Sequence, residues 1–475
     1  MGYRNKGTSW FALSTVSAML ATTALAQVGG GRTGVRFQPT VITPAQVGEA
    51  ETTTRNEPAE LTTDGRIHLF LQLEDEPAAA VFARARNDYQ SRMSYITRGG
   101  PAASEQQASS LAATEAIRQS RSLDTKQLSL ISRLTSDEFN AEVLFRAQTA
   151  VNGIAVVVNP SQRDALALLP GVKSVAPIHG KKPMATTSVE YMGTRNFWDP
   201  ARLNALGDGV GVVVIDTGID FVHTAFGGPG LNNGTASGYA AGRTSIDGSV
   251  AANTFPTAKV IWGWDLVGDA YNGGAATPPV VTPTGDPNPM DVNGHGTACG
   301  SLAVGFGVLT SGATYTGSYN ATEPLITGTG NTMRISPGIA PKAALYGLRV
   351  FGTAGSTFVS SQAVDIATAV RIWQLSPEGT PYPPILANLT GAAPIPRTPV
   401  LAIASMSLGD DAGLDYVGDP DTDSANNANA AGLSVIAAAG NAYDNYYNAG
   451  TPANATAALS VAASYTARVR RSPTA

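Results

Sequence analysis

VGVVVIDTGID, residues 210–220, gives the clearest indication of the fold. It opens with the apolar run Val210–Ile215, and continuous runs of this kind are typical of parallel strands buried on both faces. The run ends at Asp216, which predicts a carboxylate at the carboxyl edge of a sheet, where ligands bind in open α/β folds. An aspartate at this position also suits an Asx turn that leaves the strand, with Gly218 supplying the bend. Asp216 is therefore a candidate functional residue with a structural alternative.

Similar apolar runs recur along the second half of the chain, and stretches of helical character separate several of them. Strands that alternate with helices predict an α/β domain with a doubly wound, mostly parallel sheet. The predicted strands are Lys259–Leu266, Ala343–Val350, Val400–Met406, Leu433–Ala439 and Ala458–Ala463, and the clearest helices are Val359–Trp373 and Asp423–Ala431. Stretches rich in Gly, Thr and Pro predict surface insertions at 227–257, 268–290 and 308–336.

A smaller unit precedes this domain in the sequence. Apolar patterns predict four strands and two helices in it, and Ser161 is expected to cap the second helix. The strands are Arg66–Leu73, Glu142–Arg146, Gly153–Val158 and Val172–Ile178, and the helices are Ala102–Leu134 and Ser161–Leu169. The order β-α-β-β-α-β predicts a small α+β domain of the ferredoxin-like type.

The N-terminus has the pattern of an export signal. Arg4 and Lys6 precede an apolar stretch, Trp10–Leu25, and Ala24-Leu25-Ala26 forms a small-x-small cleavage site. A transmembrane anchor is the alternative, but the stretch is short and interrupted by serine and threonine. We therefore predict a signal peptide over residues 1–26 and a secreted protein, extracellular or periplasmic, with no membrane span after signal removal.

The composition limits the partners and covalent cross-links that the protein can have. The 31 basic and 36 acidic residues give a net charge of −5, which argues against a nucleic-acid partner. The one cysteine, Cys299, rules out an internal disulfide, so the case for export depends on the N-terminus. Residues 27–63 are rich in Gly, Thr, Pro and Glu without periodicity, which predicts a flexible lead-in.

A second candidate site is DVNGHGTACG, residues 291–300. Glycines on both sides of His295 allow another backbone to approach closely, and the small residues that follow suit a tightly packed helix. A buried histidine bonded to a backbone carbonyl is the structural alternative. Asp291, His295 and Cys299 also recur every four residues, as in a metal site on one helical face, but Gly294 makes a helix through Asp291 unfavourable.

Two further motifs follow predicted strands. VIAAAGN, residues 435–441, ends at Asn441, whose amide can either donate to a developing oxyanion or occupy a turn. The backbone of SMSLG, residues 405–409, can pair with an extended ligand or simply turn at Gly409. GDGVG at 207–211 precedes its strand, whereas a dinucleotide-binding fingerprint follows one, so we do not expect a nucleotide there.

Taken in order, D-T-G-I-D, N-G-H-G-T, S-M-S-L-G and A-A-G-N resemble the subtilase family of serine peptidases, whose catalytic order is Asp, His, Ser. VNGIAVVV at 151–158 and LPGVKSVAP at 169–177 resemble the subtilase propeptide, an intramolecular chaperone and inhibitor. The H-G-T-x-C pattern is similar to the proteinase K branch. Residues 338–352 and 450–464 resemble large bacterial subtilases that carry a protease-associated insert before the serine. The resemblance spans roughly residues 64–475.

This resemblance implies a role for each motif. Asp216 would orient His295, His295 would act as general base and then general acid, and Asn441 would be the oxyanion-hole donor. The substrate backbone would bind along Ser407, Leu408 and Gly409, and the pocket for the side chain before the cleaved bond would be lined by Ala438, Ala439 and Gly440. The resemblance further implies protein or peptide substrates and inhibition by the chain's own propeptide. It implies a chemistry that requires no cofactor, and it leaves open whether structural calcium is bound.

The resemblance stops short of the nucleophile. The family places its serine in G-T-S-M-A-x-P after the asparagine motif, and no G-T-S occurs between Asn441 and Ala475. We therefore expect a propeptide domain over 64–182 and a C-terminally incomplete subtilisin-like peptidase domain over 183–475. The catalytic serine is expected beyond this sequence, and the chain as given is expected to be inactive. The last residues, 467–475, leave the family pattern, as in a fragment or a frameshift. The alternative is an inactive pseudoprotease that binds peptides through the remaining groove, whereas a metal- or nucleotide-binding module leaves the propeptide resemblance unexplained.

Overall fold

The computed structural model describes residues 61–93, 100–178, 182–183, 194–200, 203–230, 255–275, 277–319, 333–352, 356–410, 418–441 and 449–462. Contacts divide the chain into two compact units, Met1–Arg55 and Asn56–Ala475. The first unit, which includes the predicted signal peptide, lies outside the described residues, as do large parts of the predicted insertions at 227–257 and 308–336. The second unit contains both predicted folded domains.

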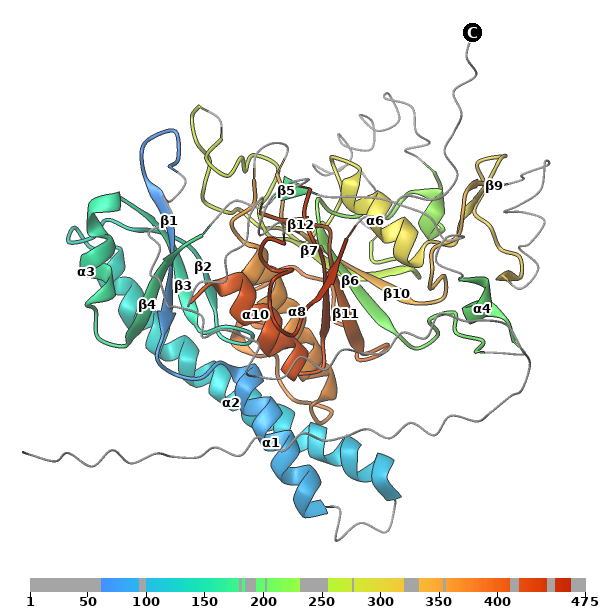
Figure 1. The fold of residues 1–475 in the computed structure, drawn as a ribbon, viewed down its shortest axis with the longest axis horizontal. Helices are drawn as coiled ribbons and strands as arrows, with labels where there is room; N and C mark the ends of the chain where they lie inside the picture. Colours follow the sequence, from blue (N-terminus) through green and yellow to red (C-terminus); the bar gives the residue numbers. More distant parts are fainter. Residues whose placement is uncertain are drawn as a thin grey trace, which may run out of the picture. The chain divides into compact units, whose positions relative to one another are not determined.

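The larger sheet of the second unit is six-stranded, in the order β14-β13-β11-β6-β10-β7 (Figure 1). Its neighbouring strands all pair in parallel. The strands are β6 (Gly211–Asp216), β7 (Val260–Asp265), β10 (Ala344–Arg349), β11 (Leu401–Met406), β13 (Ser434–Ala438) and β14 (Leu459–Val461), and the main helices are α6 (His295–Val304), α8 (Ser360–Leu375) and α10 (Pro420–Ala430). The chain winds in both directions from β6, which confirms the doubly wound α/β fold predicted from the sequence.

The central strand β6 is buried along its whole length. Its side chains alternate between the two faces of the sheet. Val213 and Ile215 belong to the core cluster that includes α8, whereas Val212 and Val214 pack in a second cluster with α6. The run of valines is continuous because a helical layer covers each face of the strand.

Helix α10 begins earlier than the predicted Asp423. The side chain of Asp419 accepts a hydrogen bond from the Thr422 amide as an N-cap, and Pro420 occupies the first turn, where proline is favoured. Gly432 follows the helix with φ 84°, a conformation that suits glycine, so the predicted C-terminal stop is confirmed.

The second sheet is four-stranded and antiparallel, in the order β2-β3-β1-β4. Its strands are β1 (Ile67–Leu73), β2 (Glu142–Ala147), β3 (Gly153–Val158) and β4 (Val172–Pro177), and its helices are α1 (Ala78–Met93), α2 (Gly100–Leu134) and α3 (Arg163–Ala167). The predicted strands and helices follow one another in the predicted order. Helix α1 is an additional helix that the sequence analysis did not predict.

Two details of this smaller unit differ from the prediction. Alanines together with polar and charged residues make up most of the sequence of α1, and only a narrow stripe that includes Ala78, Phe82 and Ala85 is buried, which hides the helical pattern. The prediction that Ser161 caps the following helix is wrong. The side chain of Asn159 accepts a hydrogen bond from the Ser161 amide and begins a 3-10 turn ahead of α3.

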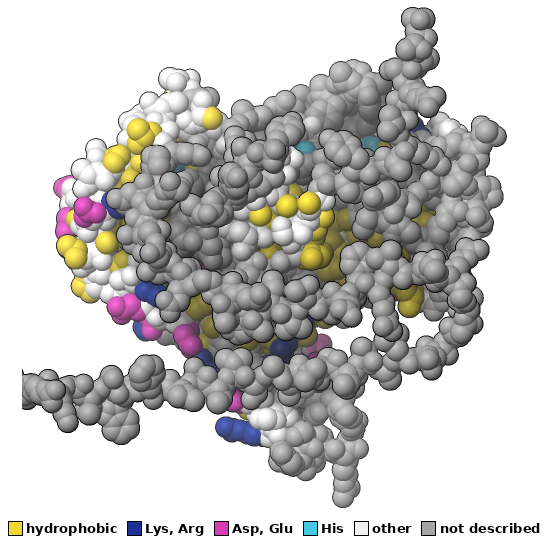
Figure 2. Space-filling view, in the orientation of Figure 1, with side chains coloured by type: hydrophobic (Ala, Val, Ile, Leu, Met, Phe, Trp, Pro, Cys, Tyr) yellow, Lys and Arg dark blue, Asp and Glu magenta, His cyan; other side chains and the backbone are white. Residues whose placement is uncertain are grey.

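Short elements complete the described parts of the unit. They are β5 (Lys182–Pro183), α4 (Arg195–Trp198), α9 (Pro384–Ala387), β8 (Val308–Leu309), β9 (Met333–Ile335), β12 (Leu408–Gly409) and the 3-10 turns η2 (Pro160–Gln162) and η3 (Thr224–Phe226). No helix within the described residues is long and apolar enough to cross a membrane. On the face drawn in Figure 2, most coloured acidic and basic side chains lie over the four-stranded sheet and its helices.

The predicted insertion at 268–290 is not confined to the surface. Tyr271 is buried in the main core cluster, and its hydroxyl accepts a hydrogen bond from the Phe358 amide. Asp265 and Asp286 form a backbone bridge that closes the base of the insertion. Composition alone predicted a surface loop because Gly, Thr and Pro outnumber the few apolar residues that anchor it.

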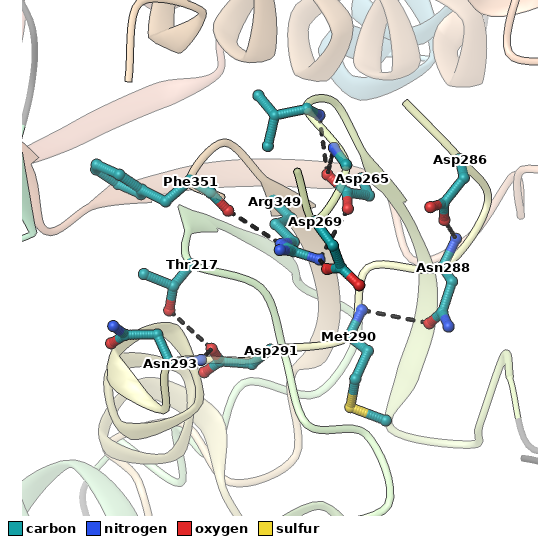
Figure 3. A network of polar contacts seen from close by, with 12 residues as sticks. Thr217, Asp265, Asp269, Asp286, Asn288, Met290, Asp291, Asn293, Arg349 and Phe351 are labelled. Carbon is teal, nitrogen blue, oxygen red and sulfur yellow. Dashed lines mark hydrogen bonds and ion pairs between the residues drawn. The ribbon is translucent and has the colours of Figure 1, made fainter. Parts of the chain in front are cut away.

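Arg349 fastens the base of this insertion (Figure 3). Its guanidinium is buried and donates to the carboxylates of Asp265, at 2.9 Å, and Asp269, at 2.6 Å. Its Nε donates to the carbonyl oxygen of Phe351 at 3.0 Å. One side chain therefore connects the end of β7, the insertion and the segment that follows β10.

We expect Arg349→Met to lower the free energy of unfolding by about 3–5 kcal/mol, because loss of one partner leaves the buried Asp265 carboxylate uncompensated. Urea unfolding followed by circular dichroism measures the change. Arg334→Met is the matched control, since Arg334 is exposed on β9 and its replacement should change the free energy of unfolding by less than about 0.5 kcal/mol. Equal effects of the two substitutions would contradict the role assigned to Arg349.

Candidate active site

Asp216 is the last residue of β6, and its carboxyl group is buried at the carboxyl edge of the parallel sheet. The Thr217 amide donates to its Oδ1 at 2.6 Å. The chain then bends at Gly218, whose φ is 111°. The carboxyl group therefore accepts from the amide of the next residue, and not from the amide two residues on as in an Asx turn.

His295 is the first residue of α6, and glycines on both sides of it have distinct roles. Gly294 acts as the N-cap with φ 101°, which glycine adopts without strain. Gly296 permits close packing, since a Cβ there would lie 2.2 Å from the carbonyl oxygen of Gly218. The helix therefore starts directly beside the loop that follows Asp216.

The two side chains form a hydrogen bond, with His295 Nδ1 2.8 Å from Asp216 Oδ1. The His295 side chain is 16% exposed and the Asp216 side chain is fully buried. A carboxylate accepts the bond, so Nδ1 carries the proton in the neutral ring and Nε2 is the basic nitrogen. Nε2 is buried and has no hydrogen-bond partner among the described residues. The neutral form of the ring can accept a proton from a third group that approaches Nε2.

Two opposing effects act on the pKa values of this pair. Burial lowers the pKa of His295, but hydrogen bonds with Asp216 and Cys299 and the Asp216 charge outweigh burial and raise the pKa to about 10. Burial raises the pKa of Asp216, and its hydrogen bond with His295 opposes that rise. The pair therefore keeps its shared proton at a higher pH than an isolated imidazole, whose pKa is about 6.5.

Cys299 lies one turn along α6 from His295. Its Sγ is 3.8 Å from Nδ1, and the side chain is buried in the core cluster between α6 and the sheet. The helix begins at His295, so Asp291 does not share a helical face with the other two residues and the metal-site alternative built on that spacing is wrong.

A different set of donor atoms does converge here. One ligand atom each from Asp216, His295 and Cys299 lies within 4.8 Å of the others. The Nδ1 nitrogen and the carboxylate oxygen that would ligate a metal are already joined by a hydrogen bond. The three side chains could each offer one donor atom to a metal ion, whereas the hydrogen bond between Nδ1 and the carboxylate suits proton transfer.

The motif at 405–409 takes part in strand pairing. Leu408–Gly409 forms β12, which pairs antiparallel with β5, so that Leu408 lies opposite Pro183 and Gly409 opposite Lys182. Ser407 precedes this pairing and is half-buried. The backbone after β11 can thus bind an extended segment, as the sequence motif indicates.

The motif at 435–441 begins within β13, and its last three residues extend beyond the strand at the same edge of the sheet. The amide of Ala439 donates to Val461 on β14, and Gly440 has φ 118°. Ala438 and Gly440 are half-buried, whereas Asn441 is exposed. The oxyanion role of Asn441 and the pocket role of the residues before it stay predictions.

The match to a family model decides the affiliation of the chain. The model described as the subtilase family matches residues 207–472, more than half of the sequence. The chain belongs to the subtilase family. The matched range contains Asp216, His295 and Asn441, so these lie within a serine-protease fold. No curated protein sequence matches the chain significantly.

Solved structures of subtilase-like proteases also resemble the chain. An epidermin leader peptide processing serine protease from Staphylococcus aureus is 14% identical with a TM-score of 0.38, over 70% of this chain and 66% of that one. Fervidolysin from Fervidobacterium pennivorans, a keratinolytic enzyme related to subtilisin, is 13% identical with a TM-score of 0.37, over 83% and 43%. Sphericase is 23% identical with a TM-score of 0.27, over 54% and 53%. The chain thus spans less than two thirds of the length of each of these structures.

Sequence reasoning missed two polar residues of this subtilase site. Thr217 lies beside Asp216 and was passed over, and Asp291 was considered only as a metal ligand. The structure joins them by a hydrogen bond of 2.9 Å (Figure 3). The available signal was their position inside the two motifs that contain Asp216 and His295.

We expect the His295 ring of the full chain to titrate with a pKa of about 10, and Asp216→Asn to lower this value because it removes the charge that opposes burial. NMR titration of the ring protons, assigned with His295→Gln, measures both values. Because the folded-state pKa exceeds 6.5, the contribution of this group to stability is complete below pH 6.5 and is lost as the pH rises through about 10.

Asp208→Asn is the control for this titration, since it removes an exposed carboxylate from the same domain. It should leave the His295 pKa unchanged. A His295 pKa that stays the same in Asp216→Asn would show that the pair is not coupled as described.

Proposed function

We propose that this chain is the N-terminal part of a secreted serine endopeptidase precursor that hydrolyses peptide bonds of proteins through Asp216, His295 and a serine in following sequence. The observation that carries the proposal is the 2.8 Å bond between His295 Nδ1 and Asp216 Oδ1 at the carboxyl edge of a subtilase sheet. His295 accepts the serine proton on Nε2 and later gives it to the leaving amine. Asp216 fixes the ring tautomer and stabilises the imidazolium.

The substrate follows the course of β5. An extended chain on Leu408–Gly409 runs antiparallel to β12, and continues past Ser407 toward the edge at which β6 ends. The amide of Asn441 donates to the oxyanion, and Ala438, Ala439 and Gly440 line the pocket for the side chain before the cleaved bond. Removal of one such donor, an asparagine in subtilisin, costs about 10²–10³ in rate.

Exposed apolar side chains on β14 support a further segment in this domain. Leu459 is 59% exposed and Val461 is 48% exposed. Strands of parallel sheets are normally covered on both faces. Covering this strand would stabilise the domain by about 25 cal/mol per Å² of apolar surface buried. We assign the serine to the polypeptide that covers it.

The test is to read the coding sequence beyond codon 475 and to express the longer product. We expect a G-T-S-M-A-x-P segment, labelling by a serine-directed fluorophosphonate and cleavage of casein. His295→Ala should reduce kcat by about 10⁴-fold or more, because it removes the general base. Cys299→Ala is the matched control one helical turn away and should keep kcat within about tenfold. The chain that ends at Ala475 should not be labelled.

Two outcomes would overturn the proposal. Cleavage by the pure chain ending at Ala475 that depends on His295 would mean that another residue is the nucleophile. A longer product that folds but lacks the serine segment and is not labelled would favour a peptide-binding pseudoprotease.

We further propose that residues 64–182 form an inhibitory propeptide. Asp365, fully buried on α8, accepts hydrogen bonds from the backbone amides of Gln148, Thr149 and Ala150, which follow β2. A carboxylate that accepts several amide bonds is a strong anchor. β5, which pairs with β12, occupies the course assigned to substrate, and maturation is expected on its C-terminal side.

Two other contacts join the proposed propeptide to the peptidase domain. The ring of His68 on β1 stacks on Phe358 with centroids 3.8 Å apart, and Gln72 donates to Asp423 at 2.7 Å. These contacts lie on both sides of the Asp365 anchor in the sequence of the peptidase domain. They support a docked inhibitor and not a domain held by its linker alone.

Asp365→Asn should weaken the association of the two domains at least tenfold, about 1.4 kcal/mol, because an NH₂ group replaces an oxygen that accepts from backbone amides. A recognition sequence for a site-specific protease is inserted into the full chain between residues 184 and 193. The protein is then cut there, and the dissociation constant of the two fragments is measured. Asp208→Asn is the control and should bind as the wild type. Fragments that separate in the wild type would contradict the inhibitor proposal, and unchanged binding in Asp365→Asn would contradict the anchor.

A further inference from the structure

Asp291 is a buried hub of hydrogen bonds just before α6. Its Oδ1 accepts from the Thr217 hydroxyl at 2.9 Å and from the amides of Asn293 and Gly294, each at 2.8 Å. Its Oδ2 accepts from the amide of Thr297 at 2.9 Å and from the Thr297 hydroxyl at 2.6 Å. The side chain is buried, and Figure 3 shows it between the turn after β6 and the start of the helix. One carboxylate therefore fixes the first turn of α6.

The Thr217 hydroxyl extends this hub toward the candidate active site. It donates to Asp291 and accepts from the Gly296 amide at 2.8 Å. Thr217 directly follows Asp216, and Gly296 directly follows His295. A single hydroxyl thus connects the chain neighbours of the two residues that share the Nδ1–Oδ1 bond.

A second bridge runs parallel to the first. The Thr297 hydroxyl, which donates to Asp291, accepts from the Asp220 amide at 2.9 Å. The loop 216–220 and the helix start are therefore joined at two points on either side of the close approach of Gly218 and Gly296. The Nδ1–Oδ1 bond alone leaves the imidazole free to rock about it, whereas these bridges fix the backbone on both sides.

We propose that Thr217 and Asp291 are positioning residues that hold the His295 ring in line with Asp216. The benefit of this positioning for peptide hydrolysis rests on the proposed function. The positioning itself does not, because the orientation of the His295 ring can be observed without substrate or turnover. Neither side chain is a catalytic residue, since neither touches the imidazole or the reacting atoms. The alternative is that the hub only stabilises the fold.

The test observes the His295 ring directly in the full chain labelled with ¹⁵N-histidine. A proton held in a short N–H···O⁻ bond and shielded from water gives a low-field NMR signal that exchanges slowly with solvent. Thr217→Val keeps the side-chain shape but removes the hydroxyl, so the His295 Nδ1–H signal should exchange with water at least tenfold faster or broaden beyond detection. Thr217→Ser restores the hydroxyl and should restore the signal.

Thr368→Val is the matched control. Thr368 is also buried and donates its hydroxyl to a backbone carbonyl, that of Val364, at 2.6 Å, but it lies on α8 away from the hub. Its replacement removes one buried hydrogen bond of similar kind and should leave the His295 signal as in the wild type. Equal loss of signal in Thr217→Val and Thr368→Val would identify a general effect of destabilisation and overturn the proposal.

Asp291→Asn provides a second variant in case Thr217→Val does not fold. Its amide keeps one oxygen for the Oδ1 partners but presents an NH₂ group to the Thr297 amide, so the same loss of the His295 signal is expected in a folded protein. A folded Thr217→Val or Asp291→Asn with the wild-type signal overturns the proposal. Unfolding of both, with Thr368→Val folded, also overturns it and assigns the hub to folding. Failure of fluorophosphonate labelling would leave all these outcomes unaffected.

Discussion

A carboxylate buried at the end of a central strand constrains the whole structure. Asp216 has no contact with water, and a buried charge is costly unless other groups supply hydrogen bonds. The adjacent Thr217 amide supplies one, and the second comes from His295 on a distant segment. For the imidazole to reach the carboxyl group, α6 must start against the loop after β6, which is why Gly218 and Gly296 meet where no Cβ fits.

The parallel sheet then determines what else can lie nearby. β6, β11 and β13 are consecutive neighbours and run in the same direction, so the residues that follow them emerge at one edge. Asp216 is the last residue of β6, Ser407 comes directly after β11, and Asn441 lies three residues beyond the end of β13. A site assembled in this way depends on the order of the strands more than on any local motif.

The smaller unit is integrated with this sheet through a shared core. Phe70 on β1 and Phe82 on α1 belong to the same cluster of buried apolar residues as Val213 on β6. Helix α8 lies between the parallel sheet and the smaller unit. Nearly all of its side chains are buried, because one side of the helix faces the sheet and the other faces the smaller unit. Asp365 is the buried carboxylate of this helix, and backbone amides of the smaller unit donate to it. Docking and folding of the two parts are therefore physically coupled.

The class of fold, most strand positions and the motifs around Asp216 and His295 could be predicted from the amino-acid sequence. These follow from local information: apolar runs report burial on both faces, and glycines beside a histidine report close backbone approach. Sequence reasoning missed α1, whose buried stripe is too narrow to produce a clear period, and it took 268–290 for a surface loop because few apolar residues anchor it. It considered Asp291 only as a metal ligand, an alternative that Gly294 already disfavoured, because the bond of Asp291 to Thr217 joins segments that are far apart in the sequence.

Which polar groups lie in contact became clear from the three-dimensional structure alone. The Nδ1–Oδ1 bond, the pairing of β5 with β12 and the amides that converge on Asp365 each join segments far apart in the chain. Such contacts depend on strand order, helix docking and side-chain direction together, and no short stretch of sequence specifies all three. Candidate site residues can be named from motifs, whereas the distances between them arise when the sheet and its helices pack.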